Sequence, residues 1–310
     1  MKLKYVLSCL SCVLLLCGFA AAQDKSAWTW QHTDTEKDGG WRRVVKVEGR
    51  AEFNEDYTDV QSLSPDGRFL VEEERGGVLR RYEVRPGADG ALVRAYTLNG
   101  AAHAFDADAR RWYEGLLLLA ARQGGLDART RVARLLRRRG VDGVLTEIRQ
   151  LEGDYARRVY FDELLKTASL DHAGLKKALE AVAAGGIMSD YERAELLRHV
   201  APAYVRADAL VPVYFSTLDG IKSDYERRRV LTHVLRLPDL SAAARRRLLT
   251  SAAALTSDYE KATLLITAAA AAGYLDDETL RLAFAAAVNT IGSDHERGRV
   301  LRATARRTGN

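Results

Sequence analysis

The chain has 310 residues, with 47 Lys and Arg against 42 Asp and Glu, which gives a net charge of +5. A balance this close to neutral excludes the strong attraction to polyanions of a markedly basic protein, so no nucleic-acid partner is expected. All three cysteines, Cys9, Cys12 and Cys17, lie in the first 22 residues. Without that segment the chain has no thiol for a disulfide, a metal thiolate or a nucleophile.

Residues 1–22 have the order of a secretory signal peptide. Lys2 and Lys4 precede an apolar stretch, and three alanines end at Ala22. The segment is short for a membrane span, and no other stretch approaches the roughly 20 apolar residues that a span needs. We therefore expect an exported chain, periplasmic or extracellular, with 45 basic residues against 42 acids after removal of the signal. The alternative is lipid attachment at Cys17, although Leu16 stands where lipoprotein signals have a small residue; lipidation would be the one route to membrane contact.

Residues 23–40 are predicted to be a flexible segment, and residues 41–105 a small antiparallel β domain of about five strands. Short runs rich in Val, Tyr and Leu alternate there with Gly, Pro and Asp turn signals, a pattern typical of a meander. The runs are 44–48, 68–73, 79–84 and 92–97. Asn99-Gly100 suits a two-residue hairpin turn, because both residues tolerate positive φ.

The remainder, residues 106–310, is predicted to be an α-helical repeat domain. Its first helix, 106–123, has Trp112, Leu116 and Leu119 at helical spacing, and we expect this face to cover the sheet. Gly140 divides the next helical stretch into a shortened pair, 128–139 and 142–151.

A Ser-Asp-Tyr-Glu motif, or a one-letter variant of it, then recurs at residues 189–192, 223–226, 257–260 and 293–296, with a weaker copy at 153–156. The steps between the aspartates are 36, 34, 34 and 36 residues. This period is typical of stacked helical hairpins. We therefore predict an α+β chain, in which an α-solenoid of about five HEAT-like hairpin repeats follows the β domain.

Alignment of the five copies predicts the helical core. The position six residues after the aspartate holds Tyr160, Leu196, Val230, Leu264 and Val300. The next position holds Phe161, Leu197, Leu231, Leu265 and Leu301. One hairpin cannot bury this face alone, so we expect neighbouring hairpins to stack on it.

Three residues of the motif are of the types that stabilise the N-terminus of a helix. The serine is expected to accept a first-turn amide, while the glutamate reaches back to the serine's own amide, as in a capping box. The aspartate is expected to lie at the positive end of the helix dipole. These three residues therefore have structural explanations.

The tyrosine of the motif admits two interpretations. The column comprises Tyr155, Tyr191, Tyr225 and Tyr259, with His295 in the last copy. The rings could wedge between successive repeats with their hydroxyls near water. Alternatively they form a ladder along one edge of the solenoid, offered to a peptide or glycan. On the second interpretation these five residues are candidate partner-binding residues.

A basic residue follows each aspartate by three positions: Arg157, Arg193, Arg227, Lys261 and Arg297. Because carboxylates stand nearby, we expect a solvated stripe of weak ion pairs. The alternative is a charged rim that orients an acidic partner. Arg193 and Arg227 are included among the candidate contact residues on that basis.

Signatures of catalysis are absent from the sequence: there is no His-Glu-x-x-His, Gly-x-Ser-x-Gly or phosphate-binding glycine loop. His199 and His233 are equivalent positions in adjacent copies, but neighbouring helices lie about 8–10 Å apart, which is wide for one metal. No metal and no cofactor are predicted. A second hypothesis is an envelope hydrolase acting on glycan or peptide with carboxylates at the domain junction, including Asp106 and Asp108.

Two segments together suggest a family: residues 49–105, with Phe53-Asn54-Glu55-Asp56-Tyr57-Thr58-Asp59-Val60 and Leu63-Ser64-Pro65-Asp66-Gly67, and the Asp-Tyr-Glu copies after them. The arrangement resembles poorly characterised exported bacterial proteins, and is similar to extracytoplasmic regions attached to membrane zinc-peptidase sensors of beta-lactam signalling. The chain lacks that peptidase's zinc motif and membrane helices, so no catalytic residue carries over. The resemblance implies a periplasmic sensing or scaffolding role. We therefore predict a non-catalytic extracytoplasmic interaction module whose partner is a protein or peptide of the cell envelope.

Overall fold

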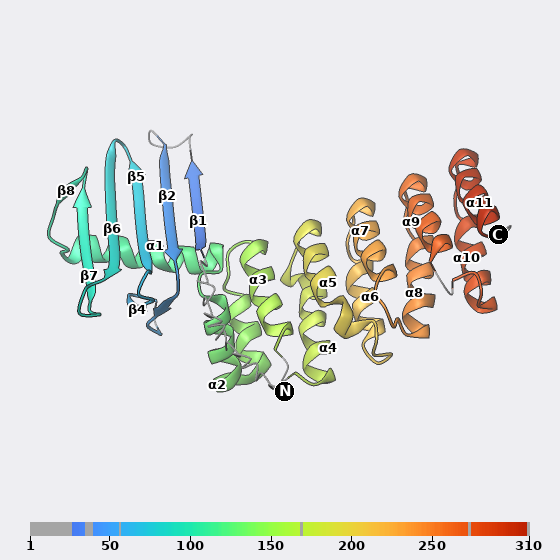
Figure 1. The fold of residues 1–310 in the computed structure, drawn as a ribbon, viewed down its shortest axis with the longest axis horizontal. Coiled ribbons are helices and arrows are strands. Elements are labelled where there is room, and N and C mark those ends of the chain that lie inside the picture. Colours follow the sequence, from blue (N-terminus) through green and yellow to red (C-terminus); the bar gives the residue numbers. More distant parts are fainter. Residues whose placement is uncertain (1–26, 35–39, 56, 168–169, 272–273, 309–310) are drawn as a thin grey trace, which may run out of the picture.

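The computed structural model describes residues 27–34, 40–55, 57–167, 170–271 and 274–308, and the predicted signal segment lies outside them. An antiparallel sheet comes first and a long row of helices follows, an α+β layout (Figure 1). Within the described residues, no helix combines the length and the apolar composition needed to cross a membrane.

The main sheet has six strands, in the order β1–β2–β5–β6–β7–β8, and every neighbouring pair is antiparallel. Its strands are β1 (Ala27–Asp34), β2 (Trp41–Glu48), β5 (Arg68–Arg75), β6 (Val78–Pro86), β7 (Leu92–Leu98) and β8 (Ala101–Ala102). The short strands β3 (Ala51–Phe53) and β4 (Val60–Leu63) form a separate pair. The four predicted runs lie within β2, β5, β6 and β7. Asn99 and Gly100 have φ of 50° and 83° and form the predicted turn between β7 and β8.

The prediction of a flexible segment at residues 23–40 is wrong for residues 27–34, which form β1 and pair with β2 along their whole length. The reason is tertiary packing. Trp28 and Trp30 lie against Gly124, where an added Cβ would be 2.6 Å from Cδ1 of Trp30. Residues 23–26 and 35–39 are outside the described part of the chain.

One face of the sheet is covered by α1 (Ala107–Gly124). The buried residues shared by sheet and helix are Val45, Val47, Phe69, Val71, Tyr82, Val84, Tyr96, Tyr113, Leu116, Leu117 and Ala120. Of the three residues predicted for this contact, Leu116 is buried, whereas Trp112 and Leu119 are partly buried at its margin. The opposite face carries ion pairs such as Arg42–Glu72 and Arg68–Glu83, as expected for a sheet with one solvated side.

Eleven α-helices lie within the described residues. After α1 they are α2 (Ala128–Ile148), α3 (Asp154–Leu165), α4 (His172–Ala181), α5 (Asp190–Tyr204), α6 (Val211–Asp219), α7 (Asp224–Leu235), α8 (Ala242–Ala253), α9 (Asp258–Ala270), α10 (Glu278–Asn289) and α11 (Asp294–Thr308). A π-helical turn, η1 (Val182–Gly186), follows α4 directly. Gly140 (φ 61°, ψ −165°) interrupts α2 at the predicted break.

Five helices start at the aspartate of a motif copy, namely α3, α5, α7, α9 and α11, and successive members contact one another. Helices α4, α6, α8 and α10 make a second row (Figure 1). The position six residues after each aspartate is buried in all five copies. The next position is buried in four, but Leu301 is 55% exposed, contrary to prediction, because within the described residues no helix follows α11 to cover it.

The hydrophobic core divides into two clusters. One unites the sheet with α1 and ends at Leu126, and the other begins at Ala128 and runs through α2–α11. In terms of burial, α1 therefore belongs with the sheet, although the predicted helical domain includes it.

Candidate functional site

The serine of the motif caps its helix as predicted. The Oγ atoms of Ser189, Ser223, Ser257 and Ser293 each accept a hydrogen bond at 3.3 Å from the amide of the motif glutamate. The reciprocal half of the predicted capping box is wrong, because the serine amide is used by a different carboxylate.

That carboxylate is the aspartate of the preceding copy. Oδ2 of Asp154, Asp190, Asp224 and Asp258 accepts from the amides of Ser189, Ser223, Ser257 and Ser293 at 2.5, 2.8, 2.6 and 2.8 Å respectively. Each aspartate also accepts the amide one residue earlier, for example that of Met188 at 3.0 Å. The aspartate thus ties the first turn of its own helix to the start of the next motif helix.

Hydrogen bonding tunes these carboxyls. The amides of Ser293 and Gly292 hold the pKa of Asp258 below its ordinary value. Burial opposes ionisation of Asp224, but hydrogen bonds from Thr256 and the Ser257 amide outweigh it and lower its pKa as well.

The motif glutamate lies in a network with arginines of neighbouring copies. Glu192 pairs with Arg158 at 2.5 Å, and Glu260 pairs with Arg228, in each case from the next copy back. Glu226 pairs with Arg229 of its own helix at 2.6 Å. Glu192 and Glu260 therefore link consecutive motif helices through their side chains, and Glu226 pairs within its own helix.

Three of the five members of the basic column differ from the solvated stripe that the sequence predicts, whereas Arg157 and Arg297 are partly exposed and pair with the aspartates of their own copies. Arg193, Arg227 and Lys261 are buried, and each donates to a backbone carbonyl: Nη2 of Arg193 to Ile187, Nη1 of Arg227 to Ala254 and Nζ of Lys261 to Thr290. Helix ends leave carbonyls without intrahelical partners, and a cation is favourable there. Arg193 and Arg227 are consequently removed from the exposed surface on which a partner could be bound.

The tyrosine column is the part of the motif that remains at the surface. Tyr155, Tyr191, Tyr225 and Tyr259 are 48%, 53%, 52% and 57% exposed. All occupy the second position of consecutive motif helices, so the four rings share one edge of the row. About half of each residue is covered and half is exposed, which agrees with both interpretations of the column and provides the exposed area that a contact surface requires.

Arginines flank the rings. The guanidinium of Arg158 lies 5.3 Å from the ring centre of Tyr155, and that of Arg228 lies 5.3 Å from Tyr225. Arg229 lies between two rings, 5.7 Å from Tyr191 and 5.9 Å from Tyr225. Cation–π contacts of this kind hold both partners in place.

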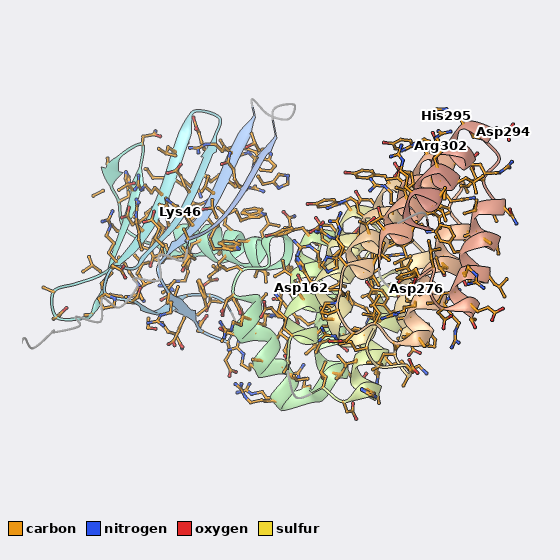
Figure 2. The ribbon with its side chains drawn as sticks, turned by 45° about the vertical axis from the view of Figure 1, so that its right-hand side comes forward. Lys46, Asp162, Asp276, Asp294, His295 and Arg302 are labelled. Carbon is orange, nitrogen blue, oxygen red and sulfur yellow. The ribbon has the colours of Figure 1, made fainter. Side chains whose placement is uncertain are left out.

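The column ends at His295, whose side chain is 76% exposed. Figure 2 shows His295, Asp294 and Arg302 together at the end of the helical row farthest from the sheet. The side chain of Asp294 is 96% exposed, and among the described residues there is no later helix start for it to hold.

The two histidines considered as ligands have other surroundings. Nδ1 of His199 lies 3.1 Å from Oδ2 of the buried Asp162, which Arg158 also contacts. Burial lowers the pKa of His233, and the nearby charge of Arg198 adds to this. Across the described residues, no group of three His, Cys, Asp or Glu side chains is placed to hold a metal ion.

A hollow of about 300 Å³ lies at the junction of the sheet and the helices. Its walls include Trp28, Phe53, Tyr155, Asp127 and Glu163. Because Tyr155 belongs both to the hollow and to the tyrosine column, the two features are continuous.

Asp127 is one of two acids, with Glu163, that line this hollow and that sequence reasoning missed. Burial raises its pKa, although a hydrogen bond from the Tyr57 hydroxyl acts in the opposite direction. Its backbone has a φ of 53°, which is uncommon for a residue other than glycine. The Gly124-Gly125 break before it is a signal in the sequence, but the burial of the carboxyl depends on contacts with the distant Tyr57.

The two acids that were predicted for the junction, Asp106 and Asp108, have other interactions. Asp106 caps α1 by accepting from the amides of Asp108 and Ala109, and these bonds lower its pKa. The side chain of Asp108 is 65% exposed and pairs with Arg80 and Arg111. Neither residue lines the junction hollow.

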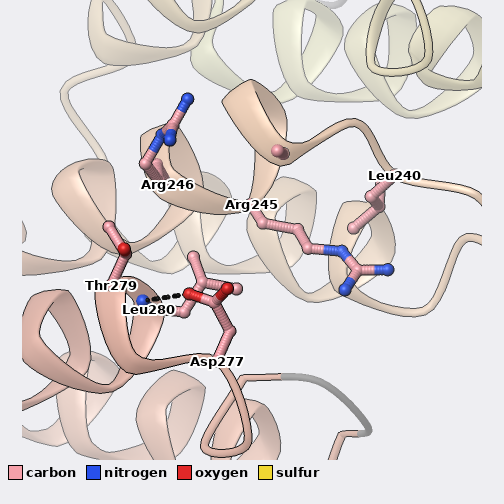
Figure 3. A pocket seen from close by; sticks show the side chains of 7 residues that line it. Leu240, Arg245, Arg246, Asp277, Thr279 and Leu280 are labelled. Carbon is pink, nitrogen blue, oxygen red and sulfur yellow. Dashed lines mark hydrogen bonds between the residues drawn. The ribbon is translucent and has the colours of Figure 1, made fainter.

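Another hollow, of about 290 Å³, lies between the starts of α8 and α10 (Figure 3). Arg245 and Arg246 line it, together with Asp277, whose carboxylate accepts from the amide of Leu280 as the N-cap of α10. Asp277 therefore has a structural role as a helix cap. None of the tyrosines of the column lines this hollow.

Comparison of the chain with known protein families, with curated protein sequences and with solved structures gives no match. The case for function accordingly depends on the arrangement of this chain's own residues.

Proposed function

We propose that the helical part of this protein is an α-solenoid of about five HEAT-like hairpins. The support is the nearly constant step between motif copies, the side-by-side contacts of successive motif helices and the aspartate that joins each copy to the next. Solenoids of this kind present long surfaces that suit extended partners.

The function that we propose for this solenoid is that of a non-catalytic extracytoplasmic interaction or scaffolding module, which holds an extended protein or peptide along the tyrosine column. One observation carries the proposal: within the motif, the serine, aspartate, glutamate and basic residue all have structural partners, whereas the four tyrosines are about half exposed. We therefore assign partner binding to the tyrosine alone among the residues of each motif copy.

The chemistry of tyrosine fits such a role. Its ring offers a large contact area, little side-chain entropy is lost on binding, and the hydroxyl can hydrogen-bond to a peptide backbone. Tyrosines are over-represented among the residues that dominate binding energy at interfaces. The flanking arginines would keep the rings in place before a partner arrives, which reduces the cost of ordering them.

A capture experiment tests the proposal. The wild-type protein and a Tyr191→Ala, Tyr225→Ala, Tyr259→Ala variant are used to capture proteins from envelope extract. The matched control is Met188→Ala with Leu282→Ala, which removes two exposed apolar side chains (69% and 65% exposed) that lie outside the column. We expect the tyrosine variant to lose a partner that the control retains. Equal capture by all three folded proteins would refute the tyrosine-column proposal.

The location outside the cytoplasm is also a proposal, supported by the signal pattern of residues 1–22. Fractionation of cells that express the full chain tests it. Export predicts a shortened protein in the periplasmic or extracellular fraction, whereas full-length protein retained in the cytoplasm would contradict it.

A second candidate function is hydrolysis of envelope glycan or peptide at the junction hollow. The observation that favours it is a partly buried carboxyl with a raised pKa, Asp127, which lines the same hollow as Glu163 and the aromatic side chains of Trp28 and Tyr155. Turnover of peptidoglycan or model peptides that is lost in Asp127→Asn and Glu163→Gln would support hydrolysis. Absence of turnover, or turnover unchanged in both variants, would dismiss it.

A further inference from the structure

A third hollow, of about 240 Å³, lies on the helical part between the end of α2, the middle of α3 and η1. Its apolar lining comes from Leu145, Ile148 and Phe161. Two guanidinium side chains, those of Arg149 and Arg157, complete it. No carboxylate is among the residues that line it.

Arg157 differs from the other four residues of the basic column in its hydrogen-bond partner. Arg193, Arg227, Lys261 and Arg297 each donate to a backbone carbonyl. Within the described part of the chain, the side chain of Arg157 instead donates one hydrogen bond, from Nη1 to Oδ1 of Asp154 at 3.3 Å.

The backbone on one side of the hollow is irregular. The second helix of this copy does not end as a regular α-helix but continues into the π turn η1, in which Gly185 has a φ of 99°. A Cβ on Gly186 would lie 2.6 Å from the carbonyl oxygen of Ala181 and 3.0 Å from the Phe161 ring. The two glycines therefore leave room for the hollow beside Phe161.

Among the described residues, most N–H groups of the two guanidinium side chains of the hollow have no protein acceptor. A guanidinium has several N–H groups in a planar fork that matches a carboxylate. Arg149 uses one of them on Oγ1 of Thr146, at 2.9 Å, and it has no ion pair among the described residues. Arg157 uses one on Asp154. Since two cationic residues and an apolar surface line the same hollow, the occupant that it favours is an anion with an apolar part.

We propose that this hollow binds a small carboxylate with a short apolar tail, with the carboxylate against Arg149 and Arg157 and the tail against Leu145, Ile148 and Phe161. Such a group can be a free aliphatic acid or the C-terminal residue of a peptide. Two positive charges and charge-assisted hydrogen bonds select the carboxylate. The apolar floor selects the tail. This site is separate from the tyrosine column and does not depend on its function.

The test uses isothermal titration of the folded protein with hexanoate and with hexan-1-ol, which share the tail but differ in the charged group. We expect hexanoate to bind and hexanol to bind at least about tenfold more weakly, since the charge-assisted hydrogen bonds are lost. Arg157→Gln and Arg149→Gln should each weaken hexanoate binding by about tenfold or more. Arg302→Gln, on the exposed surface of α11, is the matched control and should leave it unchanged.

A second variant keeps the test valid if Arg157→Gln fails to fold. Ala184→Phe introduces bulk from the rim of the hollow, where Ala184 is exposed, and it should abolish binding while both arginines remain. Equal binding of hexanoate and hexanol, unchanged binding in these variants, or no binding of hexanoate at millimolar concentration would overturn the proposal.

A final pair of ligands distinguishes the source of the carboxylate. An acetyl-Gly-Gly-Leu peptide is compared with its C-terminal amide in the same titration. Tighter binding of the free-acid peptide than of hexanoate identifies a peptide C-terminus as the occupant. Binding of hexanoate without binding of the peptide identifies a free aliphatic acid.

Discussion

Oδ2 of Asp224 accepts the backbone amide of Ser257, 33 residues further along the chain, at 2.6 Å. The same oxygen accepts the amide of Thr256 at 2.7 Å. A carboxylate in the first turn of α7 therefore satisfies amides at the start of α9, where no intrahelical acceptor exists. The equivalent bond recurs from Asp154, Asp190 and Asp258. The nearly constant step between motif copies therefore matches the sequence separation of a hydrogen bond that joins each motif helix to the start of the next.

The first prediction concerns this bond. Asp224→Ala removes the acceptor of two amides at a part-buried helix start, and we expect the free energy of unfolding to fall by about 1–3 kcal/mol, since unsatisfied donors are costly. Urea unfolding followed by circular dichroism measures it.

The chain supplies the matched control for this substitution. Asp294→Ala changes the same motif position in the last copy, where the side chain is 96% exposed, and it should change the unfolding free energy by less than about 0.5 kcal/mol. If the two variants were equally stable, the aspartate would act only on its own helix dipole.

The second prediction concerns the buried basic column. Arg227→Leu leaves the Ala254 carbonyl without its side-chain donor and removes the contact to Asp219. We expect a loss of about 1–3 kcal/mol in unfolding free energy. Lys222→Ala, an exposed lysine near the start of the same helix, is the control and should be nearly neutral. An equally small effect at both positions would indicate that the column is a weak surface stripe after all.

The third prediction tests how β1 is attached. Gly124→Ala places a Cβ 2.6 Å from Cδ1 of Trp30 and 2.9 Å from Cζ2 of Trp28. We expect a lower melting temperature and a shift in tryptophan fluorescence. Gly115→Ala in the same helix meets no atom within 4 Å and should stabilise the protein by up to about 1 kcal/mol, because alanine favours helix. Identical behaviour of the two variants would contradict the packing of β1 on α1.

The fourth prediction is a pH dependence. The pKa values of Asp224 and Asp258 are lowered in the folded protein from an ordinary 3.8. Below that value the unfolded chain therefore binds more protons than the folded one, so these carboxylates stabilise the fold above about pH 4 and cease to do so as the pH falls further. Unfolding free energies measured from about pH 5 to about pH 2 should decline more steeply in the wild type than in an Asp224→Asn, Asp258→Asn variant. Parallel pH profiles would argue against a role for these charges.

Much of the fold follows from local patterns in the sequence. The helix starts at Asp190, Asp224 and Asp258 are predictable because serine caps and apolar spacing are short-range signals. Asn99 and Gly100 are predictable for the same reason, since the turn demands positive φ at both positions. By contrast, β1 was missed, because Trp28 and Trp30 are ordered by packing on Gly124, a residue that lies far away in the sequence.

The candidate site was predicted less completely. The position of the tyrosines at the start of each motif helix is a local matter, and the column was anticipated. The burial of Arg193 and Arg227 was not, because three-residue spacing says nothing about which helix end lies beside a side chain. The same holds for Asp224, whose bond to Ser257 joins consecutive motif helices. Spacing alone could not distinguish that bond from a contact with its own helix dipole.

The most direct test of the tyrosine column is photo-crosslinking in living cells. The photoreactive analogue benzoylphenylalanine, which resembles tyrosine in shape, is placed at position 225 in one strain and at the exposed Leu282 position in another. Our account predicts an adduct with an envelope protein or peptide from position 225 and none from position 282. Adducts from position 282 alone, or the same adducts from both positions, would contradict it.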